Sequence, residues 1–424
     1  MTRGTTGEAS YVSVSDGLRT ARVLLVEQGG RGGVADYTQA LSAGLVQRGW
    51  RVALATALDH VYPPSPGIRV HRVFVYVRAR GRIGRLARRL RLSRPFNGLA
   101  YVLVLPRLAI LARSADVVHL QGGEWPPLGV ATMLVLRAAG RAPVYTPHNT
   151  FDRGRDHRAS RRAEFRLAAR VIIHARADVA ALPARARRKT VVIPHGEYGG
   201  LASRGGRADR TAARFALGVG EGELAALLFG QLREDKGVRD LVVAARQVDG
   251  TRAILAGEDL GALSACRDLL VAGDTIVRPG FQPIEEAARL FAAADVVVLP
   301  YRRASASGVL LLAYAFARPV IAYPVGGLPE AVVDGTTGWL CARPDPAALR
   351  AALADARAAG PRERERRGQA AAALASAQFS WEAISERTIA LYRDVKTRSG
   401  PPRESRLTTS GRRDREVPAG VRRR

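Results

Sequence analysis

Two basic side chains lie three residues apart in the segment Phe229 to Gly237, which reads FGQLREDKG. The segment follows an apolar run and precedes a helical pattern, so free backbone N–H groups are expected beside Arg233 and Lys236. A diphosphate carries two negative charges, which need fixed cations and backbone donors of this kind. We therefore predict that Arg233 and Lys236 bind a diphosphate; a solvated charged turn is the alternative.

Glycine and other small residues stand where three more predicted helices begin, in the segments GGRGGV, SASGV and VGGLPE. Small residues let a ligand approach the backbone, and a helix N-terminus offers free N–H groups and positive potential to an anion. The spacing is not that of a dinucleotide fingerprint, so a nicotinamide cofactor is not implied. A flexible turn is the alternative at each segment. The residues that we select as substrate contacts are Gly32, Gly33, Gly230, Ser307, Gly308, Val309, Gly326, Gly327 and Glu330.

Two histidines end apolar runs in the first half of the chain, His119 in VVHLQGG and His148 in YTPHNT. A lone histidine near a strand end is more often structural, because its ring can satisfy itself against the backbone. Two histidines at corresponding strand ends favour a functional role more strongly than one histidine alone would. We predict that His148 contacts a donor sugar or the reacting atoms, that Asn149 beside it contacts the substrate, and that His119 is a further substrate contact.

These loops need a scaffold that brings them together. Apolar runs alternate with helical patterns throughout the first half, and strands separated by helices imply parallel pairing with right-handed crossovers. Ligands of such open sheets bind beyond the carboxyl ends of the strands, which is where the selected residues stand. We expect strands at 22–27, 52–56, 70–77, 117–120, 144–146 and 171–174, with a helix at 36–48.

The same scheme restarts in the second half, after a stretch from Gly199 to Arg207 that has neither helical nor strand periodicity. Two α/β domains are therefore predicted, followed by a closing helix. The expected strands are 224–229, 253–255, 295–299 and 319–322. The expected divisions are a flexible lead at 1–20, a first Rossmann-like domain at 21–198, a linker at 199–208, a second Rossmann-like domain at 209–380, a closing helix at 381–397 and a disordered basic tail at 398–424.

Composition agrees with two globular domains and excludes several other classes. The chain has 424 residues, of which 47% are hydrophobic, and its formal net charge is +28. Cys266 and Cys341 lack the spacing of a disulfide framework or a zinc site, so cytosolic chemistry without a metal is expected. The first ten residues lack the apolar core of a signal peptide. The most apolar stretch, Leu99 to Ala112, is short and contains Pro106, so no membrane span is expected.

The ordered set of motifs resembles family 4 glycosyltransferases of the GT-B fold, from about residue 22 to 393. The motifs that carry the resemblance are GGRGGVADYTQALSAGLVQRGWRV, DVVHLQ, VYTPHNT, VIPHG, FGQLREDKGV, ADVVVLPYRRASASGVLLLAYAFARPVIAYPVGGLPEAV and DGTTGWL. The resemblance implies two Rossmann-like domains facing each other across a cleft and a nucleotide-diphosphate sugar held mainly by the second. It also implies transfer with retention of configuration, no required metal, and a closing helix that crosses back to the first domain.

Carried over by residue, the resemblance implies that His148 contacts the transferred sugar and that Arg233 and Lys236 neutralise the diphosphate leaving group. Gly32 and Gly33 would approach the donor phosphate or the acceptor. The backbone donors would come from Ser307, Gly308 and Val309.

The sequence departs from the family at two points. The family commonly carries two glutamates around the helix that begins near Gly308, and the corresponding residues here are Ala304 and Leu312. Gln231 stands where the family usually has an arginine, so Arg233 is expected to take that part. The chain is thus expected to be a variant with an SGV-type loop, and a catalytically impaired protein stays an alternative.

Charge alone suggests a nucleic-acid-binding protein, but no nucleic-acid-binding motif is found and aromatic residues make up only 6%. An epimerase on the same fold would need paired acid and base carboxylates, which are not evident. The segment Arg78 to Arg94 holds eight arginines and no acid, which is typical of a surface that binds anionic lipid, or of a solvated helix face. We expect a cytoplasmic enzyme, peripheral on the membrane, with a lipid-linked, glycan or small-molecule acceptor.

Overall fold

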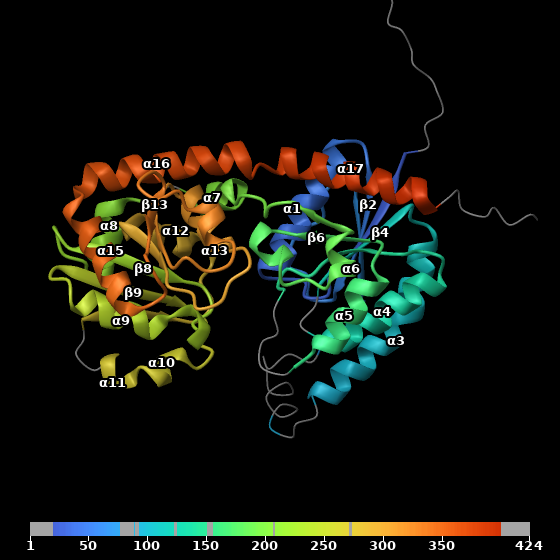
Figure 1. Cartoon of the computed structure of the whole chain (residues 1–424), viewed down its shortest axis with the longest axis horizontal. Helices are drawn as coiled ribbons and strands as arrows, with labels where there is room; N and C mark the ends of the chain where they lie inside the picture. The colour runs from blue at the N-terminus through green and yellow to red at the C-terminus, as the bar shows by residue number, and fades with distance from the viewer. Residues whose placement is uncertain are drawn as a thin grey trace, which may run out of the picture.

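The computed structural model describes residues 20–76, 89, 93–122, 125–150, 156–206, 208–270 and 274–399. It consists of two α/β domains, each built on an all-parallel sheet with helices on both faces (Figure 1). The N-terminal sheet has the strand order β3-β2-β1-β4-β5-β6-β7. Its strands are β1 (Arg22–Val26), β2 (Arg51–Ala57), β3 (Ile68–Phe74), β4 (Val117–Gln121), β5 (Val144–Thr146), β6 (Arg170–Ile173) and β7 (Thr190–Val192).

The C-terminal sheet has six parallel strands in the order β10-β9-β8-β11-β12-β13. The prediction of two doubly wound domains is thus confirmed. The strands are β8 (Leu224–Phe229), β9 (Thr251–Gly257), β10 (Thr275–Pro279), β11 (Val296–Leu299), β12 (Val320–Ala322) and β13 (Gly338–Leu340).

Helices cover both faces of each sheet, so the central strands are buried on both sides and consist of continuous apolar runs, as in β8 and β11. The helices of the N-terminal domain are α1 (Gly33–Gln47), α3 (Ser93–Arg113), α4 (Pro126–Ala138), α5 (Arg158–Leu167), the short 3-10 helix η1 (Arg176–Val179) and α6 (Ala184–Arg187). Those of the C-terminal domain are α7 (Gly199–Gly205), α8 (Arg210–Leu217), the 3-10 helix η2 (Glu234–Lys236), α9 (Val238–Arg246), α10 (Ala262–Ala265), α11 (Arg267–Leu270), α12 (Ile284–Ala293), α13 (Gly308–Ala315), α14 (Leu328–Ala331), α15 (Pro346–Ala358) and α16 (Gly360–Gln378).

Helix α17 (Trp381–Ser399) follows α16 and packs on α1 of the N-terminal domain, so the two helices run along one side of both domains (Figure 1). Trp381 anchors its start, because the indole Nε1 donates to the carbonyl of Glu197 at 2.8 Å. Near its other end, Arg170 forms an ion pair with Asp394 at 2.6 Å. The chain therefore returns to its first domain after completing the second.

Some elements differ from the sequence expectations. The stretch 199–205, expected to be an irregular linker, forms α7 and packs against α12 and α13, because alanine and leucine in GGLASRG bury against those helices. Strands β10 and β13 and helix α16 were not expected. Most of the lead at 1–20, of Arg78 to Arg94 and of the tail lies outside the described residues.

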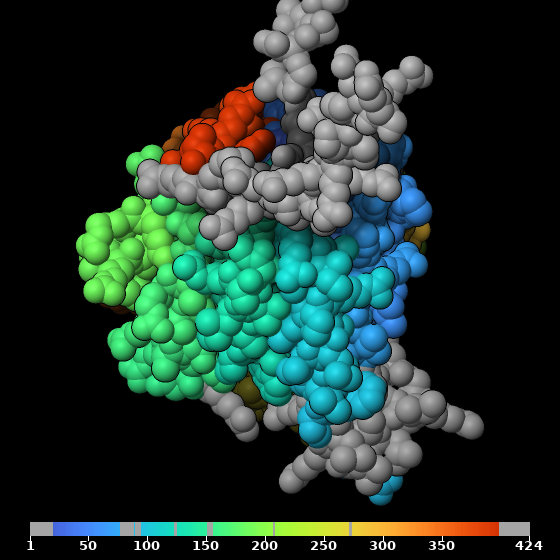
Figure 2. All heavy atoms as spheres, turned by 90° about the vertical axis from the view of Figure 1, so that its right-hand side faces the viewer, coloured from blue at the N-terminus to red at the C-terminus, as the bar shows by residue number. Residues whose placement is uncertain are grey.

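Helix α3 is longer and more exposed than the sequence indicates. The segment Pro95–Arg113 is, by its length and apolar composition, long enough to cross a membrane. Core helices of soluble proteins can have the same length and composition. One face of α3 packs on the sheet through residues such as Leu108, which is fully buried. The other face is apolar and exposed, with 71% of Leu103 and 64% of Ile110 accessible to solvent. Helix α3 (cyan) lies at the surface of the N-terminal domain (Figure 2).

Candidate functional site

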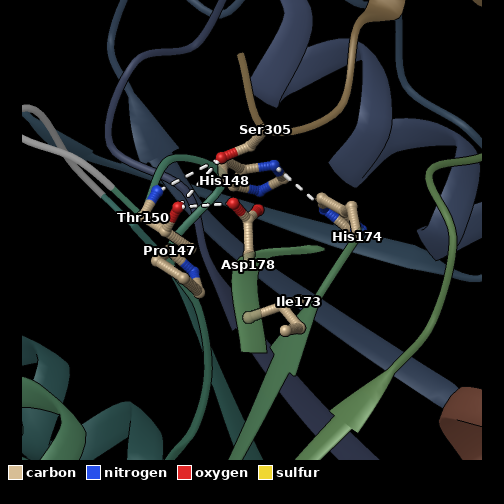
Figure 3. A pocket seen from close by; sticks show the side chains of 7 residues that line it. All are labelled: Pro147, His148, Thr150, Ile173, His174, Asp178 and Ser305. Carbon is tan, nitrogen blue, oxygen red and sulfur yellow. Dashed lines mark hydrogen bonds between the residues drawn. The ribbon is translucent and has the colours of Figure 1, made fainter. Parts of the chain in front are cut away.

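The carboxyl ends of β5 and β6 meet the loop before α13 at a small cavity between the two domains (Figure 3). The N-terminal domain supplies most of its wall, and Ser305 supplies the C-terminal side. Both domains therefore contribute to one site, as expected for ligands of open parallel sheets. The lining residues are Pro147, His148, Thr150, Ile173, His174, Asp178 and Ser305.

His148 lies in this cavity with an unusual backbone conformation. Its φ of 55° is in the left-handed region, which residues other than glycine adopt rarely and often at functional sites. Its Nε2 lies 2.7 Å from Oε1 of Gln121, and its Nδ1 lies 3.4 Å from Nε2 of His174. Burial, and then the neighbouring imidazole of His174, lower the pKa of His148 well below its usual value. The ring is therefore neutral at physiological pH.

A cluster of aromatic rings packs against the His148 side chain. The ring of Tyr37, on α1, lies about 5 Å from three imidazoles, with centroid distances of 4.9 Å to His148, 5.1 Å to His174 and 5.1 Å to His195. Trp381 of α17 packs against Tyr37 at 5.2 Å. Burial lowers the pKa of His174 to about 3 and that of His195 to about 4. The strained residue is thus held by rings that stay uncharged.

Asp178 is the carboxylate of the cavity. It lies on η1, directly after β6, and only 8% of it is exposed. Thr150 donates its hydroxyl to Oδ1 at 2.9 Å, and Ser305 Oγ lies 3.1 Å from Thr150 Oγ1. Oδ2 is buried and makes no hydrogen bond within the described part of the chain. Burial raises the pKa of Asp178, and hydrogen bonding from the side chains of Thr150 and Ser305 opposes the rise.

The basic segment predicted to bind a diphosphate lies beyond the carboxyl end of β8. Arg233 forms a bidentate ion pair with Asp235, at 2.8 and 3.1 Å, and donates to Oε1 of Gln231 at 2.7 Å. Lys236 Nζ lies 3.4 Å from the centroid of the Tyr301 ring, a cation–π contact. The two cations therefore come from one loop and are held in place by their neighbours.

Glycines shape this loop. Gly230 has φ 105° and Gly237 has φ 67°, conformations that favour glycine, and a Cβ on Gly237 would lie 2.0 Å from the carbonyl oxygen of Pro300. The loop can therefore pack directly against the end of β11. This close approach brings Lys236 onto Tyr301.

Tyr198 lies between the N-terminus of α13 and the glycine loop of the N-terminal domain. Ser307 caps the helix by accepting from the N–H of Leu310, and Gly308 and Val309 form the first turn. The Tyr198 hydroxyl lies 2.9 Å from where a Cβ on Gly308 would stand, and 3.9 Å from the same position on Gly33. The SASGV segment and the N-terminal glycine loop therefore approach each other on either side of one tyrosine.

Within the N-terminal glycine loop, two amides are already occupied. Glu27 accepts from the N–H groups of Gly29 and Gly30, at 2.6 and 2.8 Å. Gly32 has φ 80° and open space where a side chain would stand. The part of the loop that is open to a ligand is therefore Gly32 and Gly33, and close by in α1 burial raises the pKa of Asp36 to about 6.

His119 was expected to contact a substrate, whereas the structure gives its side chain partners within the protein. The side chain is fully buried. Its Nδ1 lies 2.6 Å from the hydroxyl of Tyr392, and its Nε2 lies 2.7 Å from the hydroxyl of Thr146. Burial lowers its pKa to about 3. Because both ring nitrogens have partners, His119 joins α17 to the N-terminal sheet and cannot reach a ligand.

The VGGLPE segment also differs from expectation, since it forms contacts within and between the domains. A Cβ on Gly326 would lie 1.7 Å from the carbonyl oxygen of Ala304, and one on Gly327 would lie 2.5 Å from the Ala175 side chain. Glu330 accepts from the backbone N–H groups of Arg176 and Ala177, at 2.9 and 2.7 Å. Gly326 thus packs within the C-terminal domain, whereas Gly327 and Glu330 lie at the contact between the domains, and their role as substrate contacts stays a prediction.

Asn149 lies beside the cavity, and its backbone carbonyl accepts from Arg161 at 3.1 Å. Ala304 is partly buried and Leu312 packs in the C-terminal core, and neither apolar side chain has an oxygen that could bind a ligand. Sequence reasoning missed Asp178 and His174, for which the only signal is their position after strand β6, and it missed the Tyr37 cluster, whose rings come from helices and loops far apart in the sequence. Among the described residues, no group of three or more His, Cys, Asp and Glu could hold a metal ion.

Family models match both domains. The model described as Glycosyl transferase 4-like domain matches residues 32–180, and the one described as Glycosyl transferases group 1 matches residues 223–358.

Among curated proteins, the chain is similar to D-inositol 3-phosphate glycosyltransferases. It is 33% identical to the one from Segniliparus rotundus over 216 residues, which are 49% of this chain and 47% of that protein. It is 37% identical to the one from Mycobacterium tuberculosis strain H37Ra over 194 residues, which are 44% of this chain and 40% of that protein. The chain thus spans less than half the length of these relatives.

Solved structures resemble the whole fold at low identity. Sucrose-phosphate synthase from Thermosynechococcus elongatus has a TM-score of 0.69 at 21% identity, over 89% of this chain and 100% of that one. Anabaena HepE in complex with UDP has a TM-score of 0.67 at 19% identity, over 88% of this chain and 100% of that one. The likeness covers both domains.

Proposed function

We propose that this chain, which has the GT-B fold and matches glycosyl transferase family models in both domains, is a hexosyltransferase-type glycosyltransferase. It moves a sugar from a nucleotide-diphosphate sugar to an acceptor and retains the anomeric configuration. The observation that carries the proposal is the cavity lined by His148 of one domain and Ser305 of the other. The cavity of about 10 Å³ has room for about one water molecule, so the transferred sugar would lie at the junction of the two domains beside it.

The donor's diphosphate would bind beyond β8. Arg233 and Lys236 would neutralise the charge that develops on the diphosphate as the bond from sugar to oxygen breaks, which is usually the largest single contribution to such a transfer. Gly230 would allow the backbone to approach, and Ser307, Gly308 and Val309 would offer the free N–H groups of α13. One structural neighbour was solved with UDP, which supports a nucleotide diphosphate as the ligand.

The sugar would contact the N-terminal domain. The neutral imidazole of His148 would face it, with Asn149 beside it, while Gly32 and Gly33 would approach the phosphate or the acceptor. We further propose that the chain is a variant with an SGV-type loop, because Ala304 and Leu312 supply no carboxylate where the family commonly has two. Another side chain must then bind the sugar and ribose hydroxyls.

The acceptor would enter from the N-terminal domain. The curated relatives are named for D-inositol 3-phosphate, which supports a small polar acceptor. A lipid-linked or glycan acceptor at a membrane is supported by a different observation, the exposed apolar face of α3 next in sequence to the arginines of residues 78–94. We propose that the enzyme works in the cytoplasm and binds the inner face of the plasma membrane through these segments.

Calorimetric titration of the full chain with UDP-, GDP- and ADP-sugars tests the donor. We expect one base to bind in the micromolar to millimolar range, and the nucleoside monophosphate of that base to bind at least about tenfold more weakly, because it lacks one of the charges that Arg233 and Lys236 would meet. No binding of any of these nucleotides at millimolar concentration would contradict the proposal. Salt-sensitive binding of DNA or RNA in its place would favour the nucleic-acid alternative.

A further inference from the structure

One atom of the interdomain cavity is left without a partner. Asp178 is 8% exposed, and its Oδ2 makes no hydrogen bond to any described residue. A buried carboxylate oxygen without a donor is costly, since that oxygen has lost its hydration and gained no hydrogen bond in return. Its side chain points into the cavity toward Ser305 and Thr150 (Figure 3). An arrangement of this kind calls for a ligand that donates a hydrogen bond.

The surrounding residues hold Asp178 in this position from two sides. Thr150 fixes Oδ1 with its hydroxyl at 2.9 Å. Glu330, from the other domain, binds the N–H groups of the two residues before Asp178, Arg176 and Ala177. The contact between the two domains therefore helps to place the Asp178 segment.

We propose that Asp178 binds a hydroxyl group of the donor's sugar through Oδ2 and so helps to select that sugar. This inference rests on the proposed function. An ionised carboxylate only accepts hydrogen bonds, so it suits a hydroxyl and rejects a sugar that lacks it at that position. His148 lines the same cavity, which places the hydroxyl close to the reacting end of the donor. The side chains of Ala304 and Leu312 offer no hydrogen-bond acceptor, so a carboxylate from the opposite domain would bind the sugar hydroxyl.

The test compares Asp178→Asn with the wild type by calorimetry, using UDP-glucose and UDP as the first probes and the base found above if it differs. We expect the variant to bind the sugar nucleotide about 10- to 100-fold more weakly, the loss typical of a hydrogen bond to a charged group, and to bind UDP as the wild type does. Its melting temperature should stay equal or rise, because an unsatisfied buried charge is removed. Asp268→Asn, which changes an exposed carboxylate on α11, serves as the matched control and should alter neither affinity.

Deoxy analogues of the sugar nucleotide locate the hydroxyl. For the wild type, one analogue should bind more weakly than the parent donor. For Asp178→Asn, the same analogue and the parent donor should bind equally well. Thr150→Val, which removes the group that orients Asp178, should weaken sugar-nucleotide binding by a smaller factor. The inference is overturned if Asp178→Asn binds UDP and the sugar nucleotide as the wild type does, if it loses both equally, or if it melts several degrees lower with unchanged affinities. Failure of the wild type to bind any nucleotide would instead reject the proposed function.

Discussion

The carboxylate of Glu330 accepts a hydrogen bond from the backbone N–H of Ala177 at 2.7 Å, and this bond joins the C-terminal domain to the segment that carries Asp178. Its other oxygen accepts from Arg176 at 2.9 Å. A side chain that follows a glycine-rich loop thus bridges the two halves of the molecule. Contact between the domains and the arrangement of the cavity are therefore connected.

Glu330→Gln should lower kcat/KM for sugar transfer about three- to tenfold, because the glutamine side chain has only one acceptor oxygen for the two N–H groups and its own NH2 group faces the other. The affinity for UDP should not change, since the proposed diphosphate site lies wholly in the C-terminal domain. Steady-state kinetics and calorimetry measure the two quantities. Glu285→Gln, on the exposed face of α12, is the control. Equal loss of UDP affinity would show that Glu330 acts at the nucleotide instead.

Substitution of His119 should change the stability of the protein, whereas substitution of His148 should change its activity. His119→Gln should reduce the free energy of unfolding by about 1–3 kcal/mol, because the buried hydroxyls of Thr146 and Tyr392 lose a partner, and should leave donor affinity unchanged. His148→Asn, which tolerates the left-handed backbone, should keep the stability and lower kcat about 100-fold or more. Denaturant titration and kinetics of both variants test the assignment. A stable, inactive His119→Gln would reverse it.

Acidification should destabilise the protein below about pH 6.5. His119, His174 and His195 have pKa values of about 3 to 4 in the folded state, whereas histidines of an unfolded chain titrate near 6.5. Between these values the unfolded state binds more protons, so the free energy of unfolding falls as the pH falls, and above pH 6.5 this effect is absent. Urea titrations from pH 4.5 to 7.5 measure the slope. His195→Gln should reduce it by about one proton, and an unchanged slope would contradict the assignment.

The exposed face of α3 should contribute to membrane binding. Leu103→Ser/Ile110→Ser replaces two exposed apolar side chains and should weaken binding to anionic vesicles several-fold, with little change in melting temperature. Neutralising Arg85, Arg88, Arg89 and Arg91 should abolish the preference for anionic over neutral vesicles. Co-sedimentation with both kinds of vesicle tests both changes. Equal binding of all variants to both vesicles would reject membrane association through these segments.

Much of the fold could be predicted from the sequence because the buried strands are continuous apolar runs, as in β1 and β8, and the loops after them are marked by glycine. Arg233 and Lys236 could be identified for the same reason, since they stand together in one short segment directly after a strand. Strand β10 was missed because only part of it is buried and it contains Arg278. The linker was misjudged because the short α7 depends on packing against α12 and α13, which the local sequence does not reveal.

The cavity could be predicted only in part, because several of its residues depend on distant partners. The role of His119 is decided by Tyr392, 273 residues away, and the role of Glu330 by backbone amides about 150 residues earlier. Asp178 stands in a segment, ARADV, with no motif to mark it. Its importance comes from burial and from one oxygen without a partner, both of which are properties of the folded chain.

Calorimetric titration of Arg233→Ala/Lys236→Ala with the nucleoside diphosphate decides whether Arg233 and Lys236 bind the diphosphate of a nucleotide sugar. We expect the wild type to bind and the variant to bind at least about 100-fold more weakly, because each charge-assisted contact contributes roughly 1.5–3 kcal/mol. Lys189→Ala, at the edge of the N-terminal sheet, should bind as the wild type does. Equal affinity in the wild type and the double variant would contradict the claim.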